Sequence, residues 1–305
     1  MTPTLTRKYH IPVMMPQCIE GLDIKPKGVY VDVTFGGGGH SRAILDQLDS
    51  DGLLIAFDQD PDAKSNLPEN DNFIFVDHNF QYFKNFLKFY NHEKVDGILA
   101  DLGISSHQID EGSRGFSFRH DAPLNMRMDQ SSELTAYEVI NTYSEEDLTR
   151  IFKTYGELRY ARKFASTIGA YRLKKSIETT LELANLASEF IPLKQRSKEL
   201  ARLFQAIRIE VNQELEVLRR FLDQCADSLK PGGRLVVMSY HSLEDRLVKN
   251  LMTTGSVDGD TISDEFGPQQ SPFKLLNRKP ITPDDEELQA NPRSRSAKLR
   301  IAEKR

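Results

Sequence analysis

The stretch VDVTFGGGGH, residues 31–40, decides the expected fold. Residues 28–35 alternate and are rich in β-branched and aromatic side chains, which predicts a strand. Four consecutive glycines follow, and residues 41–49 then have the pattern of a helix. Strand, glycine loop and helix in this order are typical of a nucleotide-binding turn, because glycines let a ligand approach the backbone closely.

The rest of the chain continues this rhythm and then interrupts it. Further strands are predicted at residues 52–58, 72–78, 94–103 and 230–241, with a pair of closing edge strands at 273–278 and 296–304. Between them, residues 123–208 show only helical patterns, one of which starts at Ser144 with Asp147 three residues later as an acidic relative of the capping box. We therefore expect an α/β domain with a parallel sheet, formed by residues 1–122 and 209–305, and an inserted all-helical domain at 123–208.

Composition narrows the class of protein. The chain has 305 residues, 39% of them hydrophobic, and a formal net charge of −5, which argues against a protein that coats nucleic acid nonspecifically. No apolar run approaches the roughly 20 residues that span a bilayer, so no membrane partner is expected. The N-terminus lacks the apolar segment of a secretory signal. Cys18 and Cys225 lie far apart in the sequence. The sequence does not decide whether they form a disulfide, but it favours a protein in the reducing cytoplasm.

Positive charge is concentrated locally despite the acidic total. Seven basic residues lie between Lys153 and Lys175, and six lie within residues 291–305. These runs are either solvated helix faces or contacts for RNA phosphates. Residues 114–129, RGFSFRHDAPLNMRMD, interleave aromatic rings with arginines, so they either stack bases and bind phosphates or pack on their own phenylalanines.

An acidic residue completes the predicted nucleotide site. Asp58 ends the second strand, 22 positions after Gly36, where a carboxylate would accept hydrogen bonds from ribose hydroxyls. The third glycine of a dinucleotide fingerprint is missing, because Ser41 or Arg42 stands in its place. This favours a ligand without a pyrophosphate, such as S-adenosylmethionine. His40 is either a helix cap or a ligand contact.

Asp101 ends the fourth strand, and the carboxyl ends of central strands line the ligand crevice of open α/β sheets. It is either part of the site or a loop cap. No metal is expected: the remaining histidines have no metal-ligand spacing, namely His10, His78, His92, His107 and His120.

Nine motifs along the chain together resemble one known family. They are TFGGGGHS, AFDQDP, DGILADLGISSHQ, RGFSF, LNMRMD, YGELRYA, FQAIRIEVNQEL, PGGRLVVMSYHSLEDR and NPRSRSAKLRIAE. This set, which runs from His10 to Glu303, resembles the bacterial 16S rRNA cytosine-N4 methyltransferases of the RsmH family, formerly called MraW.

The resemblance implies a fold, a cofactor and a partner. The fold would be a class I S-adenosylmethionine-dependent methyltransferase sheet, Rossmann-like, with an inserted helical substrate-recognition domain. The partner would be 16S rRNA within the small ribosomal subunit, and the product would be N4-methylated cytosine of the decoding centre. The oligomeric state stays open, and a homodimer is compatible with the sequence. The implied cofactor-binding residues are Gly38, Gly39, His40, Asp58, Phe80, Asp101 and Gln108.

The chemistry points to one candidate catalytic residue. The lone pair of the cytosine amino group is conjugated into the ring, so a buried acceptor is needed to stabilise developing positive charge. Related amino-methyltransferases carry a D/N/S-P-P-Y/F sequence at this strand end, whereas this chain has DLGIS. Asp101 is thus the candidate amine acceptor, unless it serves only the cofactor. Tyr240 and His241 either replace the missing stacking aromatic or merely fill a strand end.

Three other functions compete with this hypothesis. A nicotinamide-dependent oxidoreductase has the same fold class but is disfavoured by the missing third glycine. A ribosome-assembly factor without catalysis would keep the pocket only as a sensor. A methyltransferase acting on DNA or protein would share the chemistry but not the substrate.

Overall fold

The computed structural model describes residues 12–260, 263–264, 267–268 and 270–305, so that His10 lies outside the described residues. The chain folds into two compact units. Unit 1 comprises Met1–Gly103 and Val217–Arg305, and unit 2 comprises Ile104–Glu216. Within the described ranges, no helix is both long and apolar enough to cross a membrane.

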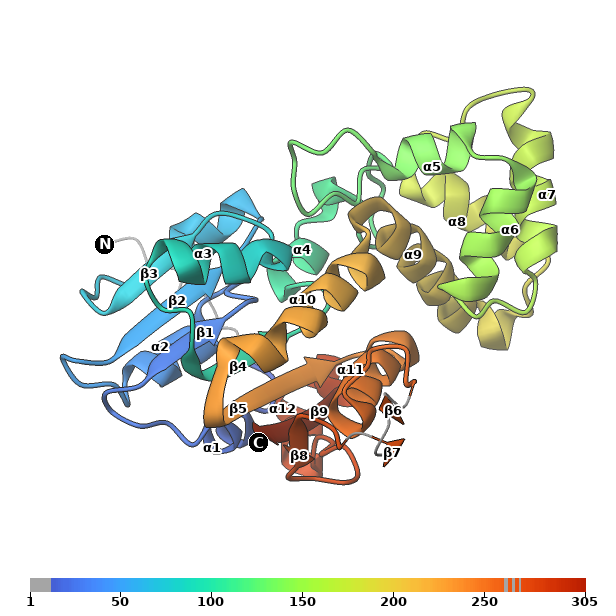
Figure 1. Cartoon of the computed structure of the whole chain (residues 1–305). Helices are drawn as coiled ribbons and strands as arrows, with labels where there is room; N and C mark the ends of the chain where they lie inside the picture. The colour runs from blue at the N-terminus through green and yellow to red at the C-terminus, as the bar shows by residue number, and fades with distance from the viewer. Residues whose placement is uncertain (1–11, 261–262, 265–266, 269) are drawn as a thin grey trace, which may run out of the picture. The chain divides into compact units, whose positions relative to one another are not determined.

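A seven-stranded sheet forms the centre of unit 1, in the order β3-β2-β1-β4-β5-β9-β8 (Figure 1). Strands β1 to β5 are mutually parallel, whereas β9 runs antiparallel to both β5 and β8. The bounds are β1 (Val29–Asp32), β2 (Leu53–Phe57), β3 (Phe73–Val76), β4 (Val95–Asp101), β5 (Leu229–Ser239), β8 (Phe273–Leu275) and β9 (Lys298–Lys304). A separate two-stranded sheet pairs β6 (Ser263–Asp264) with β7 (Gly267–Pro268).

The predicted parallel sheet is confirmed, but one detail of the prediction is wrong. The two closing strands are not both at the edge, since β9 lies between β5 and β8. Its residues Leu299 and Ala302 are fully buried, and because they lie three positions apart they face opposite sides of the sheet. An inner strand must be covered on both faces, so β9 contributes to the core of unit 1.

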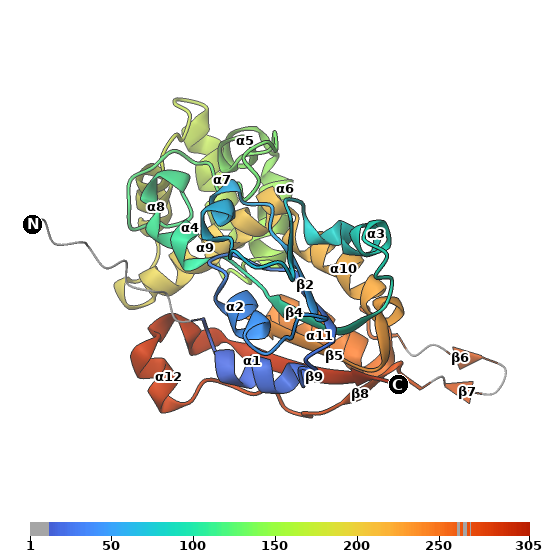
Figure 2. The same ribbon diagram turned by 90° about the vertical axis from the view of Figure 1, so that its left-hand side faces the viewer.

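Helices cover both faces of this sheet, as the two views show (Figures 1 and 2). On one face, α1 and α2 pack through Cys18, Leu22 and Ile44 against Leu99, Val236 and Leu299 of the strands. The opposite face carries α3, α10 and α11. The helices of unit 1 are α1 (Met15–Leu22), α2 (Gly39–Leu45), α3 (Phe83–Phe89), most of α10 (Glu214–Ser228), α11 (Ser242–Thr254) and α12 (Asp285–Ala290), with 3₁₀ turns at Pro61–Asn66, Phe80–Tyr82 and Pro292–Ser296.

Unit 2 is helical in its described residues. Its helices are α4 (Ser106–Asp110), α5 (Ala136–Thr142), α6 (Glu145–Thr154), α7 (Ala161–Arg172), α8 (Thr180–Ser188) and α9 (Arg196–Asn212), with 3₁₀ turns at Gly112–Arg114 and Leu193–Gln195. The start predicted at Ser144 is confirmed, because its hydroxyl accepts a hydrogen bond from the Asp147 amide. Helices α9 and α10 are separated by the single residue Gln213, whose backbone is left-handed with φ 50°.

The expected domain boundaries, 122/123 and 208/209, lie inside unit 2 and differ from the observed divisions at 103/104 and 216/217. The segment before residue 123 belongs with the helices, because Phe116 is part of their hydrophobic core. In addition, the Thr180 hydroxyl donates to the carbonyl of His120 and accepts from the amide of Ala122. At the other end, α9 continues to Asn212. Non-local packing of this kind leaves no local signal at residue 104 or 216.

Candidate functional site

The glycine loop joins β1 to α2, and three of its four glycines are required by the fold itself. Gly36 and Gly38 have φ values of 51° and 73°, in the left-handed region that side chains disfavour. A Cβ on Gly39 would lie 2.1 Å from Cγ of Pro12. Only at Gly37 would a Cβ meet nothing within 4 Å. Close approach by a ligand is therefore needed to explain one glycine, not four.

Asp58 follows β2 directly and shapes this loop. One carboxylate oxygen accepts a hydrogen bond from the amide of Gly36 at 2.7 Å, and the other accepts from the amide of Asp60 at 2.8 Å. Burial raises the pKa of this carboxyl to about 6. Each oxygen has a second lone pair, so the carboxylate can still accept from a pair of ligand hydroxyls.

Three side chains on one face of the sheet converge at the ends of adjacent strands. Alternation along each strand places Asp32 of β1, Asp101 of β4 and Tyr240, just beyond β5, on the same side as α1 and α2. The register staggers them by two residues from one strand to the next, since Asp32 pairs with Leu99 and Asp101 pairs with Met238, so that each is a diagonal neighbour of the next on this face. The sequence predicted Asp101 at this end of the sheet but missed Asp32, whose position in the alternating VYVD stretch was the available signal.

Asp32 is a structural part of this constellation. Its side chain is 1% exposed, and its carboxylate accepts from the hydroxyl of Ser41 at 2.7 Å and from the amide of Thr34 at 3.0 Å. Burial raises its pKa. The Thr34 hydroxyl in turn accepts a hydrogen bond from the backbone amide of Asp101 at 2.7 Å. These bonds tie the end of β1 to the end of β4 and to the first turn of α2.

Asp101 is held from two sides. The hydroxyl of Tyr240 donates to its Oδ1 at 2.8 Å, and Nδ1 of His40 lies 3.8 Å from its Oδ2. Burial raises the pKa of Asp101 to about 6, and the contacts with His40 and Tyr240 oppose this shift. The carboxylate thus retains acceptor capacity at the end of a central strand, close to the glycine loop.

His40 does not cap the helix, so that alternative is wrong. The N-cap of α2 is Gly38, and no side-chain cap hydrogen bond is present there. The buried His40 ring instead makes a 3.2 Å hydrogen bond from Nε2 to the carbonyl of Val13 and directs Nδ1 toward Asp101. The alternative role as a ligand contact stays a prediction.

Phe80 is the predicted aromatic residue near the loop. It opens a 3₁₀ turn whose N-cap, Asn79, donates to the side-chain oxygen of Gln59 at 2.7 Å, next to Asp58. The half-buried ring packs edge-on against Phe221 of α10, with 5.3 Å between centroids. The ring is partly exposed to solvent, and its role in stacking on the adenine stays a prediction.

Gln108 belongs to unit 2, where its side chain completes a capping box. Its amide oxygen accepts from the backbone N–H of Ser105 at 3.0 Å, while its own N–H donates to the Ser105 hydroxyl. The residue is 6% exposed. The other predicted site residues, Gly38, Gly39, His40, Asp58, Phe80 and Asp101, all lie in unit 1.

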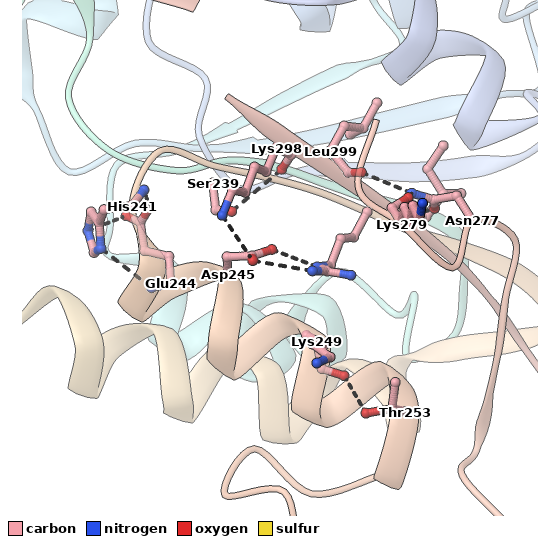
Figure 3. Close-up of polar contacts among 12 residues, drawn as sticks. Ser239, His241, Glu244, Asp245, Lys249, Thr253, Asn277, Lys279, Lys298 and Leu299 are labelled. Carbon is pink, nitrogen blue, oxygen red and sulfur yellow. Dashed lines mark hydrogen bonds and ion pairs between the residues drawn. The ribbon is translucent and has the colours of Figure 1, made fainter. Parts of the chain in front are cut away.

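Tyr240 and His241 have distinct structural roles after β5. His241 is the N-cap of α11 and lies beside Glu244 (Figure 3). The Glu244 carboxylate accepts hydrogen bonds from the backbone amides of both Tyr240 and His241. The next residue, Asp245, hydrogen-bonds to Lys298, as Figure 3 shows. Asp245 also accepts two hydrogen bonds from Arg300 of β9. Both residues therefore make specific contacts beyond the end of β5, while their role as a replacement for the stacking aromatic stays a prediction.

Residues 114–129, which were expected either to contact RNA or to pack on their own phenylalanines, pack within unit 2. Phe116 is 7% exposed, and Phe118 packs edge-on against Phe204. The guanidinium of Arg114 donates to the carbonyls of Arg127 and Met128. These rings and this arginine hold the loop together within unit 2.

The geometry of unit 1 fits an adenosine-type ligand. A bare backbone faces open space at Gly37, a carboxylate follows at the next strand end, and a half-exposed aromatic ring lies one strand further on. An open, doubly wound α/β sheet with these features defines a nucleotide-binding enzyme of the Rossmann-like class.

Comparison with known proteins specifies the family. The family model described as MraW methylase family matches residues 7–305, and the chain belongs to this family. It is a class I S-adenosylmethionine-dependent methyltransferase. Ribosomal RNA small subunit methyltransferase H of Bacteroides thetaiotaomicron is 53% identical over 297 residues, covering 97% of this chain and 98% of that protein.

A second relative gives the same result. The protein of the same name from Flavobacterium johnsoniae is 53% identical over 301 residues, covering 99% of both chains. Among solved structures, an rRNA methylase from Streptococcus thermophilus is 13% identical with a TM-score of 0.38, covering 95% of this chain and 93% of that one. The assignment rests on the sequence relatives.

Proposed function

We propose that this methyltransferase modifies the exocyclic N4 of a cytosine in the decoding centre of 16S rRNA, within the small ribosomal subunit and in the cytoplasm. The names of its relatives support ribosomal RNA as the substrate class. The observation that carries the choice of an amino group is Asp101, an acceptor at the end of β4 whose carboxylate is oriented by Tyr240. An amino group offers the donors that such a carboxylate accepts.

The methyl donor would lie along the glycine loop. Backbone at Gly37 has space on its open side, Asp58 would accept from the two ribose hydroxyls, and Phe80 would stack on the adenine. Gly38, Gly39 and His40 would shape this cradle rather than contact the donor through side chains. When bound, S-adenosylmethionine supplies an electrophilic methyl group on a sulfonium. The role of Gln108 toward the donor remains part of the proposal.

Asp101 would act on the nucleophile. The carboxylate accepts a hydrogen bond from one N–H of the amino group. This hydrogen bond turns the amino group so that the nitrogen lone pair leaves conjugation with the ring. Orientation of this kind can supply up to ~7–11 kcal/mol of the barrier in favourable cases. The nitrogen gains the methyl group and loses one proton, and Asp101 is the base placed to take that proton.

Unit 2 would recognise the RNA. Its exposed cationic side chains include a basic patch of Arg159, Arg162 and Lys163 at the start of α7. Two other residues of the same run serve the fold, because Arg172 donates to the carbonyls of Ile140 and Tyr143 and Lys175 pairs with Glu182. The basic patch is thus the part of the run that we assign to phosphate contacts.

The basic C-terminal residues were expected to share this role, and the structure corrects that expectation in part. Arg300 is 5% exposed and binds Asp245 together with Lys298, so both residues stabilise the sheet instead. Their charges are already neutralised, which leaves them unsuited to binding phosphates.

The test is to incubate the protein and S-adenosylmethionine with unmethylated small subunits, naked 16S rRNA, DNA and protein in parallel. Nucleosides from each digest are then separated and identified by mass spectrometry. We expect N4-methylcytidine from the small subunit, and a strongly reduced but measurable yield when the Asp101→Asn variant is used instead of the wild-type protein. A methylated base of another kind, or methyl transfer to DNA or protein alone, would overturn the proposal. Analytical ultracentrifugation of the same sample tests the homodimer.

A further inference from the structure

The hydroxyl of Tyr240 lies within the site without an assigned role. Its ring packs on the backbone of Gly103, where a Cβ would lie 3.4 Å from Cδ2 of the ring. Its backbone amide is fixed by the Glu244 carboxylate at 2.9 Å. The side chain is therefore held from both ends, and its phenol donates to Oδ1 of Asp101 at 2.8 Å.

We infer that Tyr240 is a positioning residue for methyl transfer, which fixes the carboxylate of Asp101 in the orientation that accepts the target amino group. The inference rests on the proposed function of Asp101. A carboxylate anchored at Oδ1 by the phenol directs its remaining lone pairs in fixed directions, whereas an unanchored one rotates. This orientation matters because the reaction rate falls steeply when the reacting groups are displaced from the productive geometry.

His40 completes this arrangement on the other oxygen. Its Nε2 hydrogen-bonds to the carbonyl of Val13, which only accepts, so that Nε2 carries a hydrogen and the ring is held in place. Nδ1 lies 3.8 Å from Oδ2 of Asp101, and this contact lowers the pKa of Asp101. The proton lost by the amino group passes to Asp101, while the Tyr240 phenol keeps its own.

The electrostatic environment of Asp101 gives the sign of the expected pH effect. Burial raises its pKa most, and the contacts with His40 and Tyr240 lower it. The ionisable groups that face this carboxyl from the neighbouring elements are Asp32, His40, Tyr240, Glu244 and Cys18. Loss of the phenol donor removes one stabilising contact of the charged form, so protonation of Asp101 moves to higher pH.

The test compares Tyr240→Phe with Tyr30→Phe, a control that removes a buried phenol from the same sheet. The Tyr30 hydroxyl accepts from the amide of Lys25 and touches no site residue. We expect Tyr240→Phe to lower kcat by about tenfold or more, as for loss of a hydrogen bond to a charged group. The acid limb of the kcat–pH profile should move to higher pH, and Kd for S-adenosylmethionine should stay within about twofold of wild type.

A double-variant cycle separates positioning from structural damage. If Tyr240 acts through Asp101, adding Tyr240→Phe to Asp101→Asn lowers the residual rate no further. An equal fold-loss in both backgrounds, or an unchanged pH profile in a folded Tyr240→Phe protein, overturns the inference. Should Tyr240→Phe fail to fold by circular dichroism, His40→Gln provides the same pH readout from the other oxygen. Absence of any methylcytidine from the wild-type protein would instead mark failure of the proposed function.

Discussion

The glycine loop offers a test that separates ligand binding from folding. A Cβ at Gly37 faces open space, whereas a Cβ at Gly39 would lie 2.1 Å from the ring of Pro12. Gly37→Ala should therefore leave the free energy of unfolding unchanged or raise it by about 0.4–1 kcal/mol, because alanine restricts the unfolded chain. The added methyl group would occupy the donor cradle, where overpacking by one methyl costs about 1–3 kcal/mol.

These energies translate into distinct measurements. For Gly37→Ala, about 1–3 kcal/mol corresponds to a roughly 5- to 150-fold rise in Kd for S-adenosylmethionine by titration calorimetry. Gly39→Ala should lose about 1–3 kcal/mol of stability and lower Tm by roughly 2–4 °C for each kcal/mol, as measured by differential scanning calorimetry.

The contrast between the two variants is the decisive result. A stable Gly37→Ala protein that binds the donor as tightly as wild type would refute the placement of the ligand on this loop. A Gly39→Ala protein with unchanged Tm would refute the packing of Pro12 against the loop. Since both variants add the same methyl group two residues apart, each is the matched control of the other.

Three further predictions concern the charged and polar groups. Burial raises the native pKa of Asp101 to about 6, above its unfolded value of about 3.9, so the contribution of Asp101 to stability falls as pH rises from 4 to 6. Asp101→Asn should therefore raise Tm at pH 8, and the difference from wild type should shrink toward pH 4. Ser41→Ala deprives the buried Asp32 carboxylate of a 2.7 Å donor and should cost about 1–3 kcal/mol in urea unfolding. Neutralising the three charges of the basic patch should weaken small-subunit binding and reduce the slope of log K against log salt concentration by about 2 units. Lys175→Gln, the control, should leave that slope unchanged. If the triple variant has the same slope as Lys175→Gln, the basic patch faces solvent and does not bind phosphates.

Local sequence patterns predicted the elements that form the site. Asp58 and Asp101 were expected at strand ends because an apolar run followed by an acid marks both the strand and its carboxyl end, and both expectations are met. The Ser144 cap was predicted for the same reason, since capping depends on residues three positions apart. Family motifs added the cofactor and the reaction class, which periodicity alone does not provide.

Other features depend on partners far away in the chain. The Tyr240 phenol meets a carboxylate 139 positions earlier, because β4 and β5 are neighbours in register. A Cβ on Gly39 would collide with Pro12 from a distant part of the chain, and Arg300 is buried where it binds Asp245 of α11.

The sequence by itself determined the order of strands and helices, the glycine loop and the acids that end two strands, because these depend on side-chain periodicity over a few residues. Tertiary structure alone decided which side chains meet, where β9 inserts and where the two units divide. The physical reason is that strand register and packing are long-range properties, set by the burial of whole faces rather than by any short stretch of chain.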